Sequence, residues 1–170
     1  MRFLTPDWHR GELTDEEADR VEAQYAAHRA AFAQSAPGPL REIASGSSLH
    51  DAIVVSVEVT RSTRTVVLRL LAGDQQRGYF ERKITYEGVE LDHLDTQALA
   101  AIARDPASEL LSDELDALGS GLYSHDLLFW PHYREILFRF DRIQVSDAPR
   151  IDRTRHPVAD RYSESGVAAV

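Results

Sequence analysis

The stretch Ile53-Val54-Val55-Ser56-Val57-Glu58-Val59 decides the fold class, because β-branched residues alternate in it with a period of two. A second apolar run, residues 65–71, follows a short polar break at residues 60–63. A third run covers residues 79–86 and alternates in the same way. Parallel crossovers need a dozen or more residues, so these short breaks predict an antiparallel meander of three strands.

A helix is predicted before the meander, over residues 14–35. Thr14 and Glu17 have the spacing of a capping box, in which each side chain binds the backbone N–H of the other residue. The segment Pro37-Gly38-Pro39 ends the helix. Residues 1–13 are expected to form an extended lead-in, and residues 40–48 a connector with a short helical turn.

Two helices are predicted after the meander. Residues 96–104 are rich in alanine and leucine, and Pro106 interrupts the helical pattern because the residue before a proline avoids the helical region. Residues 108–118 then place Leu111, Leu115 and Leu118 at positions i, i+4 and i+7, which predicts a second helix.

Two final strands, residues 122–130 and 134–140, are predicted on either side of a turn. The predicted order is therefore α-βββ-αα-ββ, an α+β fold with a mostly antiparallel sheet of about five strands and helices packed on one face. We expect one domain over residues 1–146. Residues 147–170 are mostly polar and are expected to form a flexible tail.

Composition excludes several classes of function. The 170 residues contain no cysteine, which excludes disulfides, thiolate nucleophiles and thiolate metal sites. No apolar run reaches the roughly 18 residues of a membrane helix, and the first residues lack the apolar core of a signal peptide. The formal charge of −9 disfavours nucleic-acid binding. We therefore expect a cytoplasmic protein that binds neither membranes nor nucleic acids.

The charge is concentrated in one part of the sequence. Residues 87–126 hold ten acidic residues and one arginine, and the rest of the chain is neutral overall. A charged surface of this kind attracts an oppositely charged partner. The expected partner-binding residues, which would face a basic protein surface, are Asp92, Asp95, Glu109, Asp113, Glu114 and Asp116.

The sequence carries no established catalytic motif, and no two of its seven histidines have the spacing of metal ligands on one element. We therefore expect no metal, no cofactor and, on balance, no catalysis. The alternative is a small-ligand site or a hydrolase, with a pocket over the sheet. Its candidate residues are His50, Asp51, His125 and Trp130.

Three short segments resemble a group of uncharacterised bacterial proteins. They are the opening Met1-Arg2-Phe3-Leu4-Thr5 with Trp8, the step Leu49-His50-Asp51-Ala52 into the first strand, and the closing Phe138-Arg139-Phe140-Asp141-Arg142-Ile143. The resemblance covers about residues 1–145. Some small acidic α+β proteins with this layout resemble immunity proteins, which neutralise a toxin by binding it. The resemblance supplies no catalytic residue.

These observations lead to one preferred hypothesis and two alternatives. The preferred hypothesis is a non-catalytic, immunity-like module that binds a basic protein through its acidic helical segment. The first alternative is the ligand pocket or hydrolase around His50 and His125. The second is a structural domain that self-associates through an exposed edge strand. The sequence does not predict an oligomeric state.

Overall fold

The computed structural model describes residues 1–45, 49–76, 78–154 and 161–166. Its α-helices are α1 (Pro6–His9), α2 (Asp15–Ser35), α3 (Gly38–Ser45) and α4 (Thr96–Arg104). Its strands are β1 (Ala52–Thr60), β2 (Thr65–Asp74), β3 (Gly78–Glu87), β4 (Glu109–Gly119), β5 (Leu122–Trp130), β6 (Arg134–Phe140), β7 (Arg142–Arg150) and β8 (Tyr162–Ser165). Two short 3₁₀ turns, η1 (Arg61–Thr63) and η2 (Leu91–His93), lie between them.

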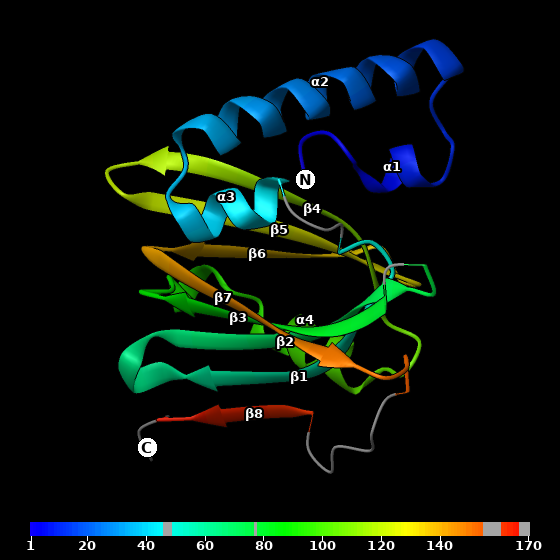
Figure 1. Cartoon of the computed structure of the whole chain (residues 1–170). Helices are drawn as coiled ribbons and strands as arrows, with labels where there is room; N and C mark the ends of the chain where they lie inside the picture. The colour runs from blue at the N-terminus through cyan, green and yellow to red at the C-terminus, as the bar shows by residue number, and fades with distance from the viewer. Residues whose placement is uncertain (46–48, 77, 155–160, 167–170) are drawn as a thin grey trace.

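The strands form one sheet in the order β6-β5-β4-β1-β2-β3-β7, with β8 added beside β1 (Figure 1). All neighbours are antiparallel except β8, which runs parallel to β1. One edge of β1 has two neighbours. Its first residues, Ala52 and Ile53, pair with β4, and its last residues, from Val57 to Thr60, pair with β8.

The sheet is strongly curled. Strands β6 and β7 stand at opposite ends of the strand order, yet only Asp141 separates them in the chain. The backbone N–H of Asp141 donates to the carbonyl of Glu87 at the end of β3, and the N–H of Glu90 donates to the carbonyl of Arg139 in β6. These bonds bring the ends of β3 and β6 together, so the two halves of the sheet face each other at this corner.

The meander and the first long helix are as predicted. Strands β1, β2 and β3 pair antiparallel in sequence order. The side chains of Val54, Leu68 and Ile84 are fully buried in the core that these strands share with the helices. Helix α2 begins with the predicted capping box, because the Thr14 hydroxyl accepts from the Glu17 N–H and the Glu17 carboxylate accepts from the Thr14 N–H.

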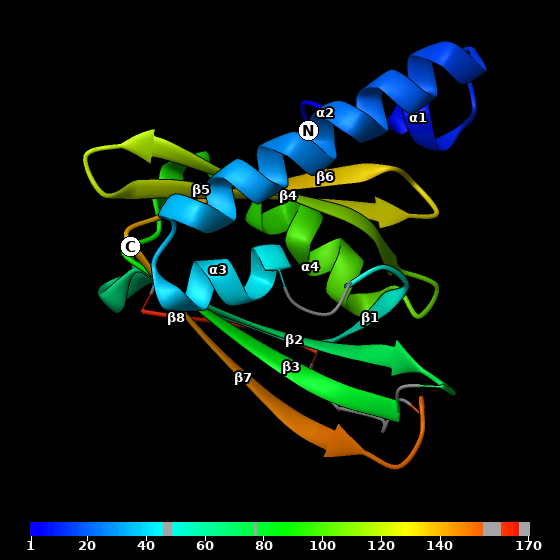
Figure 2. The same cartoon turned by 45° about the horizontal axis from the view of Figure 1, so that its top comes forward.

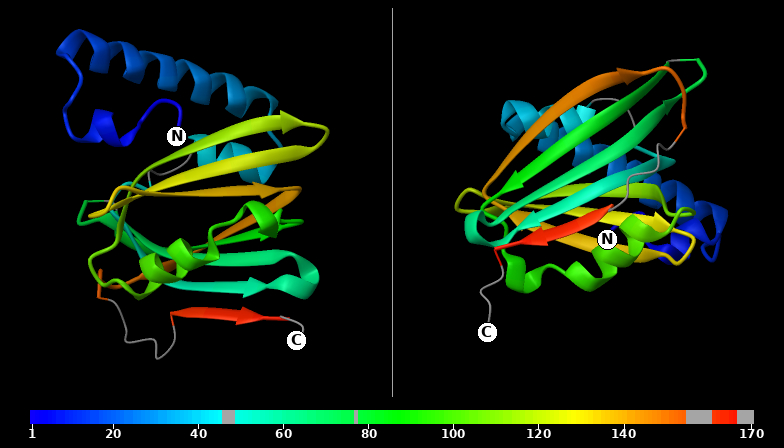
Figure 3. Two further views of the ribbon diagram at one scale, coloured as in Figure 1. Left: turned by 180° about the vertical axis from the view of Figure 1, so that it is seen from behind. Right: turned by 90° about the horizontal axis from the view of Figure 1, so that it is seen from below.

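The prediction that all helices pack on one face of the sheet is wrong, because the structure has helices on both faces. Helix α2 packs on α3 and lies along β4 (Figure 2). Helix α4 packs against β1, β6 and β8, and it lies on the opposite side of the sheet from α3 (Figures 1 and 3). A sheet this long and this curled has apolar side chains on both faces, and one layer of helices cannot cover both.

The prediction of a helix over residues 108–118 is wrong, because these residues form strand β4. Leu110, Ser112 and Glu114 are buried at alternate positions of the strand. Two of these three buried side chains are polar, so the period of two was not visible as an alternation of apolar residues. Leu118, which the helical spacing treated as a core residue, is 48% exposed.

The end of the chain also contributes strands. The expected domain boundary after residue 146 falls inside β7, which pairs with β3 along its whole length. Asp141 turns the chain toward β3, so residues 142–150 form a separate strand instead of continuing β6. Strand β8 lies within the expected tail. Residues 155–160 and 167–170 of that tail are outside the described residues. The described chain thus has eight strands where about five were expected.

Candidate functional site

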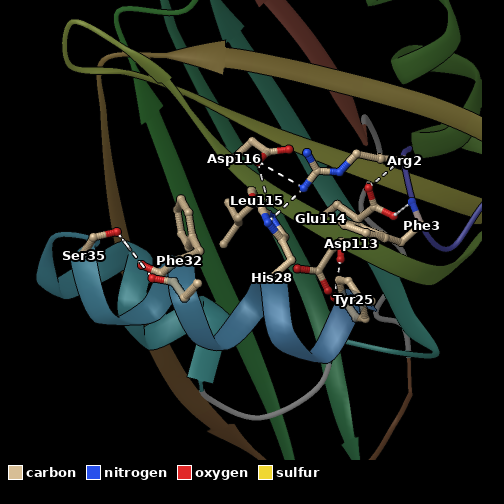
Figure 4. A network of polar contacts seen from close by, with 11 residues as sticks. Arg2, Phe3, Tyr25, His28, Phe32, Ser35, Asp113, Glu114, Leu115 and Asp116 are labelled. Atoms are coloured by element: carbon tan, nitrogen blue, oxygen red, sulfur yellow. Dashed lines mark hydrogen bonds and ion pairs between the residues drawn. The ribbon is translucent and has the colours of Figure 1, made fainter. Parts of the chain in front are cut away.

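The outer face of β4 is covered by the N-terminal segment (residues 1–9) and by α2. Glu114, which is 4% exposed, accepts three backbone N–H groups of that segment: those of Arg2 at 2.6 Å, Phe3 at 2.8 Å and Leu4 at 2.8 Å (Figure 4). A carboxylate that accepts several N–H bonds stays satisfied after burial. Glu114 therefore anchors the N-terminal segment on the sheet.

Further polar contacts join α2 to the same face. His28 on α2 bonds to the carbonyl of Leu115 at 2.8 Å and lies 3.3 Å from the Asp116 carboxylate. The Arg2 guanidinium lies 3.6 Å from the same carboxylate (Figure 4). The Tyr25 hydroxyl donates to the backbone carbonyl of Asp113 at 2.6 Å. These contacts hold α2 at a distance from β4 that leaves an open space beside the Tyr25 side chain.

A chain of buried hydrogen bonds lies behind β4. The His125 ring is fully buried, with Nε2 3.1 Å from Asp113 Oδ2 and Nδ1 2.8 Å from the Tyr86 hydroxyl. A carboxylate oxygen only accepts, so Nε2–H donates to Asp113, and Nδ1 shares a hydrogen bond with the Tyr86 hydroxyl. Burial, with the charge of Asp113, raises the pKa of Tyr86 and keeps its proton in place. The chain fixes the orientation of Asp113.

A cavity of about 210 Å³ opens between the N-terminal segment, α2 and β4. We call it the α2–β4 pocket. Its volume corresponds to roughly seven water molecules. Apolar and ionisable side chains share its wall, as is typical of small-molecule sites. The lining residues are Leu4, Trp8, His9, Tyr25, Arg29, His50, Leu111, Ser112 and Asp113.

Two donors in this wall lack a protein acceptor among the residues that the structure describes. The Arg29 guanidinium lies 5.9 Å from the centre of the Tyr25 ring, and no carboxylate in the described ranges forms an ion pair with it. The Trp8 indole Nε1 is buried and forms no hydrogen bond there. The Arg29 side chain is half-buried, so its guanidinium stays open to an anionic ligand. Trp8 Nε1 has almost no accessible surface, so a ligand in the cavity does not reach it.

The two histidines of the pocket have different surroundings. His9 shares a 2.9 Å hydrogen bond with the hydroxyl of Ser112, and burial, together with repulsion by His50, lowers its pKa. His50 is more exposed, and its Nδ1 donates to the carbonyl of Leu111 at 2.6 Å. His9 is therefore a neutral hydrogen-bonding group near pH 7, and the permanent positive charge of the wall comes from Arg29.

The four alternative-pocket residues do not meet in one site. His50 lines the α2–β4 pocket and lies 3.3 Å from Asp51, its neighbour in the chain. His125 is buried behind Asp113. Trp130 is 45% exposed and lines a different cavity of about 170 Å³ with residues of α4 and of the turn after β5. The positions of these four residues in the sequence do not show which of them lie near one another in the fold.

The six candidate acidic residues are not gathered on one surface, and five of them have partners within the chain. Asp95 caps α4 by accepting from the Ala98 N–H. Glu109 pairs with Arg153 at 3.1 Å. Asp113, Glu114 and Asp116 bind His125, the N-terminal segment, and Arg2 with His28, as described above. Asp92 lies exposed in η2.

Most pocket residues could not be recognised from the sequence. Trp8, His9 and Arg29 lie in the lead-in and on a helix with ordinary composition, 80 or more positions before the β4 residues that they face. The only local signal was the alternation of buried residues along β4. It could not be recognised because two of those buried residues, Ser112 and Glu114, are polar.

No protein-family model matches this sequence, and comparisons with curated proteins and with solved structures find no match. Within the described ranges, no three histidine or acidic side chains are grouped as metal ligands. None of the described helices has the length and apolar character needed to cross a membrane.

Proposed function

We propose that this protein binds a small polar molecule in the α2–β4 pocket. The observation that carries the proposal is the wall of one small cavity, in which an arginine without a carboxylate partner among the described residues and an oriented aspartate occur together. Convergent polar groups in an otherwise apolar cavity are the usual mark of a ligand site.

The rigidity of the wall supports this proposal. Asp113 is fixed by His125 from behind, and Tyr25 is fixed by its bond to the Asp113 carbonyl. The N-terminal segment that carries Trp8 is held by Glu114. A ligand that enters such a site loses little affinity to reorganisation of the protein, because the groups are already in place.

Binding to a basic protein partner stays a prediction. It has less physical support than the pocket, because most of the candidate carboxylates already bind groups of this chain, and residues 109–118 form a strand of the sheet instead of a projecting helix. The immunity-like role rests on the sequence resemblance alone.

The chain contains two tryptophans, which makes a direct test possible. In a ¹H–¹⁵N spectrum, Trp8 and Trp130 give one indole N–H signal each, and the variants W8F and W130F assign them. We expect a binding compound from a panel of amino acids, small carboxylic acids, amines and sugars to shift the Trp8 signal and leave Trp130, in the other cavity, unchanged. The proposal fails if no compound shifts Trp8, or if the same compounds shift Trp130 alone.

A further inference from the structure

We infer that the ligand is a small zwitterion of the α-amino-acid type, whose carboxylate binds Arg29 and whose ammonium group binds Asp113. This inference rests on the proposed function and adds the chemical class and the orientation of the ligand.

The positively charged side of the pocket, at Arg29, favours an anionic group on the ligand. The Arg29 guanidinium can donate in a planar fork that matches a carboxylate, and the described part of the chain supplies no carboxylate to it. A ligand carboxylate satisfies this guanidinium. Trp8 lines the same cavity, so its indole signal reports binding there.

The negatively charged side of the pocket, at Asp113, favours a cationic hydrogen-bond donor on the ligand. Asp113 Oδ2 accepts one hydrogen bond from His125, and the side chain is still 20% exposed. An ionised carboxylate has about four lone-pair sites, so Asp113 keeps capacity for a ligand ammonium group. The His125–Tyr86 chain holds the carboxylate in one orientation, which suits recognition of a donor from a fixed direction.

The two ends are close enough for one small molecule. Both adjoin Tyr25, whose ring lies under Arg29 and whose hydroxyl contacts the backbone of Asp113. A simple anion would leave Asp113 unmatched in the cavity, and a simple cation would leave Arg29 unmatched. Leu4 and Leu111 provide an apolar wall for a side chain. The cavity of about 210 Å³ has room for a single amino acid.

The first experiment uses the Trp8 indole signal and the unmodified protein. Each of the twenty standard amino acids is titrated alone, and the best binder is compared with its amide, which lacks the carboxylate, and with its 2-hydroxy acid, which lacks the ammonium group. We expect the amide and the hydroxy acid each to bind at least about tenfold more weakly, because each loses a charged hydrogen bond. Equal binding of either analogue overturns the inference.

Two variants then test which group of the ligand binds Arg29 and which binds Asp113. R29Q should abolish the preference for the amino acid over its amide, and D113N should abolish the preference over its hydroxy acid. R20Q, on an exposed part of α2, and D92N, in exposed η2, are matched controls that should keep both preferences. If both pocket variants keep both preferences, the assignment is wrong. If a variant fails to fold in a thermal melt, the analogue series on the unmodified protein still decides the class.

The outcomes separate the inference from the proposed function. If no amino acid shifts Trp8 but another small molecule does, the zwitterion is excluded and the pocket remains a binding site. If no compound of either panel shifts Trp8, both proposals fall.

Discussion

Strands β2 and β4 both cross the middle of the sheet, but they are held there by different forces. The buried side chains of β2 are apolar, among them Val66, Leu68 and Leu70. The buried face of β4 includes Ser112 and Glu114, and each finds its partner in the N-terminal segment, at His9 and at the backbone of residues 2–4. β2 is stabilised by removal of apolar area from water. β4 also buries Leu110 and Leu115, and its satisfied polar groups add to that stabilisation.

This difference teaches where a site can form. An apolar strand packs against any apolar surface of suitable shape. A strand with buried polar groups needs particular donors at particular places, so it fixes the segment that supplies them. The N-terminal segment is fixed on β4 in this way, and Trp8 and His9 reach the pocket wall as a result.

The largest expected effect is in β2. Leu68→Ala removes a fully buried side chain and leaves a cavity, so we expect a loss of about 2–5 kcal/mol in the free energy of unfolding. Urea denaturation measures it. Leu118→Ala in β4, where the side chain is 48% exposed, is the control and should change stability by no more than about 0.5 kcal/mol. A similar loss in both variants would contradict the assignment of Leu118 to the surface.

A smaller but more specific effect is expected in β4. Glu114→Gln keeps the shape of the side chain, but it removes the charge and turns one acceptor into a donor that faces a backbone N–H. We expect a loss of about 2–3 kcal/mol and faster hydrogen exchange at the amides of Arg2, Phe3 and Leu4.

Glu87→Gln in β3 is the matched control for this variant. The Glu87 carboxylate binds Arg142, whose side chain is 78% exposed, so the loss should stay below about 1 kcal/mol. If the two glutamine variants are equally stable, Glu114 does not anchor the N-terminal segment as described.

The next effect concerns the helix that lies above β4. Thr14→Ala removes the capping box of α2, and we expect a loss of about 1 kcal/mol. The Thr14→Ser variant, which keeps the hydroxyl, should retain most of the stability. Since the pocket is lined by Tyr25 and Arg29, two and a half turns or more further along α2, the Trp8 indole shift should not change. A shifted signal would show that fraying at residue 14 reaches the pocket.

The smallest effect appears only in the pH dependence. The pKa of His9 in the folded protein is lowered from its ordinary 6.5 by burial and by repulsion from His50. The folded state therefore favours the neutral ring. Its contribution to stability is complete above pH 6.5 and is lost as the pH falls through the lowered pKa.

Thermal melts between pH 7.5 and pH 4.5 should show this loss in the unmodified protein and a weaker one in His9→Gln. His93→Gln, at an exposed histidine of η2, is the control and should follow the unmodified protein. A parallel pH dependence in all three proteins would mean that His9 titrates freely.

The parts of the fold that could be predicted are those in which local sequence and burial agree. The alternation at residues 53–59 gave β1, and Thr14 with Glu17 gave the start of α2. Strand β4 could not be predicted, because its register depends on donors that residues 2–4 supply from more than a hundred positions away. A buried glutamate has no local sign in a sequence.

The candidate site was predictable only in fragments. His50 was named, and it lines the pocket. Asp113 was named as a residue for a partner surface, and it lies between the pocket and a buried histidine. Arg29 looks ordinary in the sequence. Its role follows from the lack of a carboxylate partner among the residues that the structure describes.

The divided edge of β1 has a consequence for how this protein folds. Strand β4 covers only the first two residues of that edge, and the stretch from Val57 to Thr60 is covered by β8, the last of the described strands. During synthesis this stretch keeps its backbone groups open until residues 162–165 have been made. An uncovered strand edge readily recruits a strand from another molecule. Strand β8 adds only four residues to the sheet, but it pairs the part of the β1 edge that β4 leaves open.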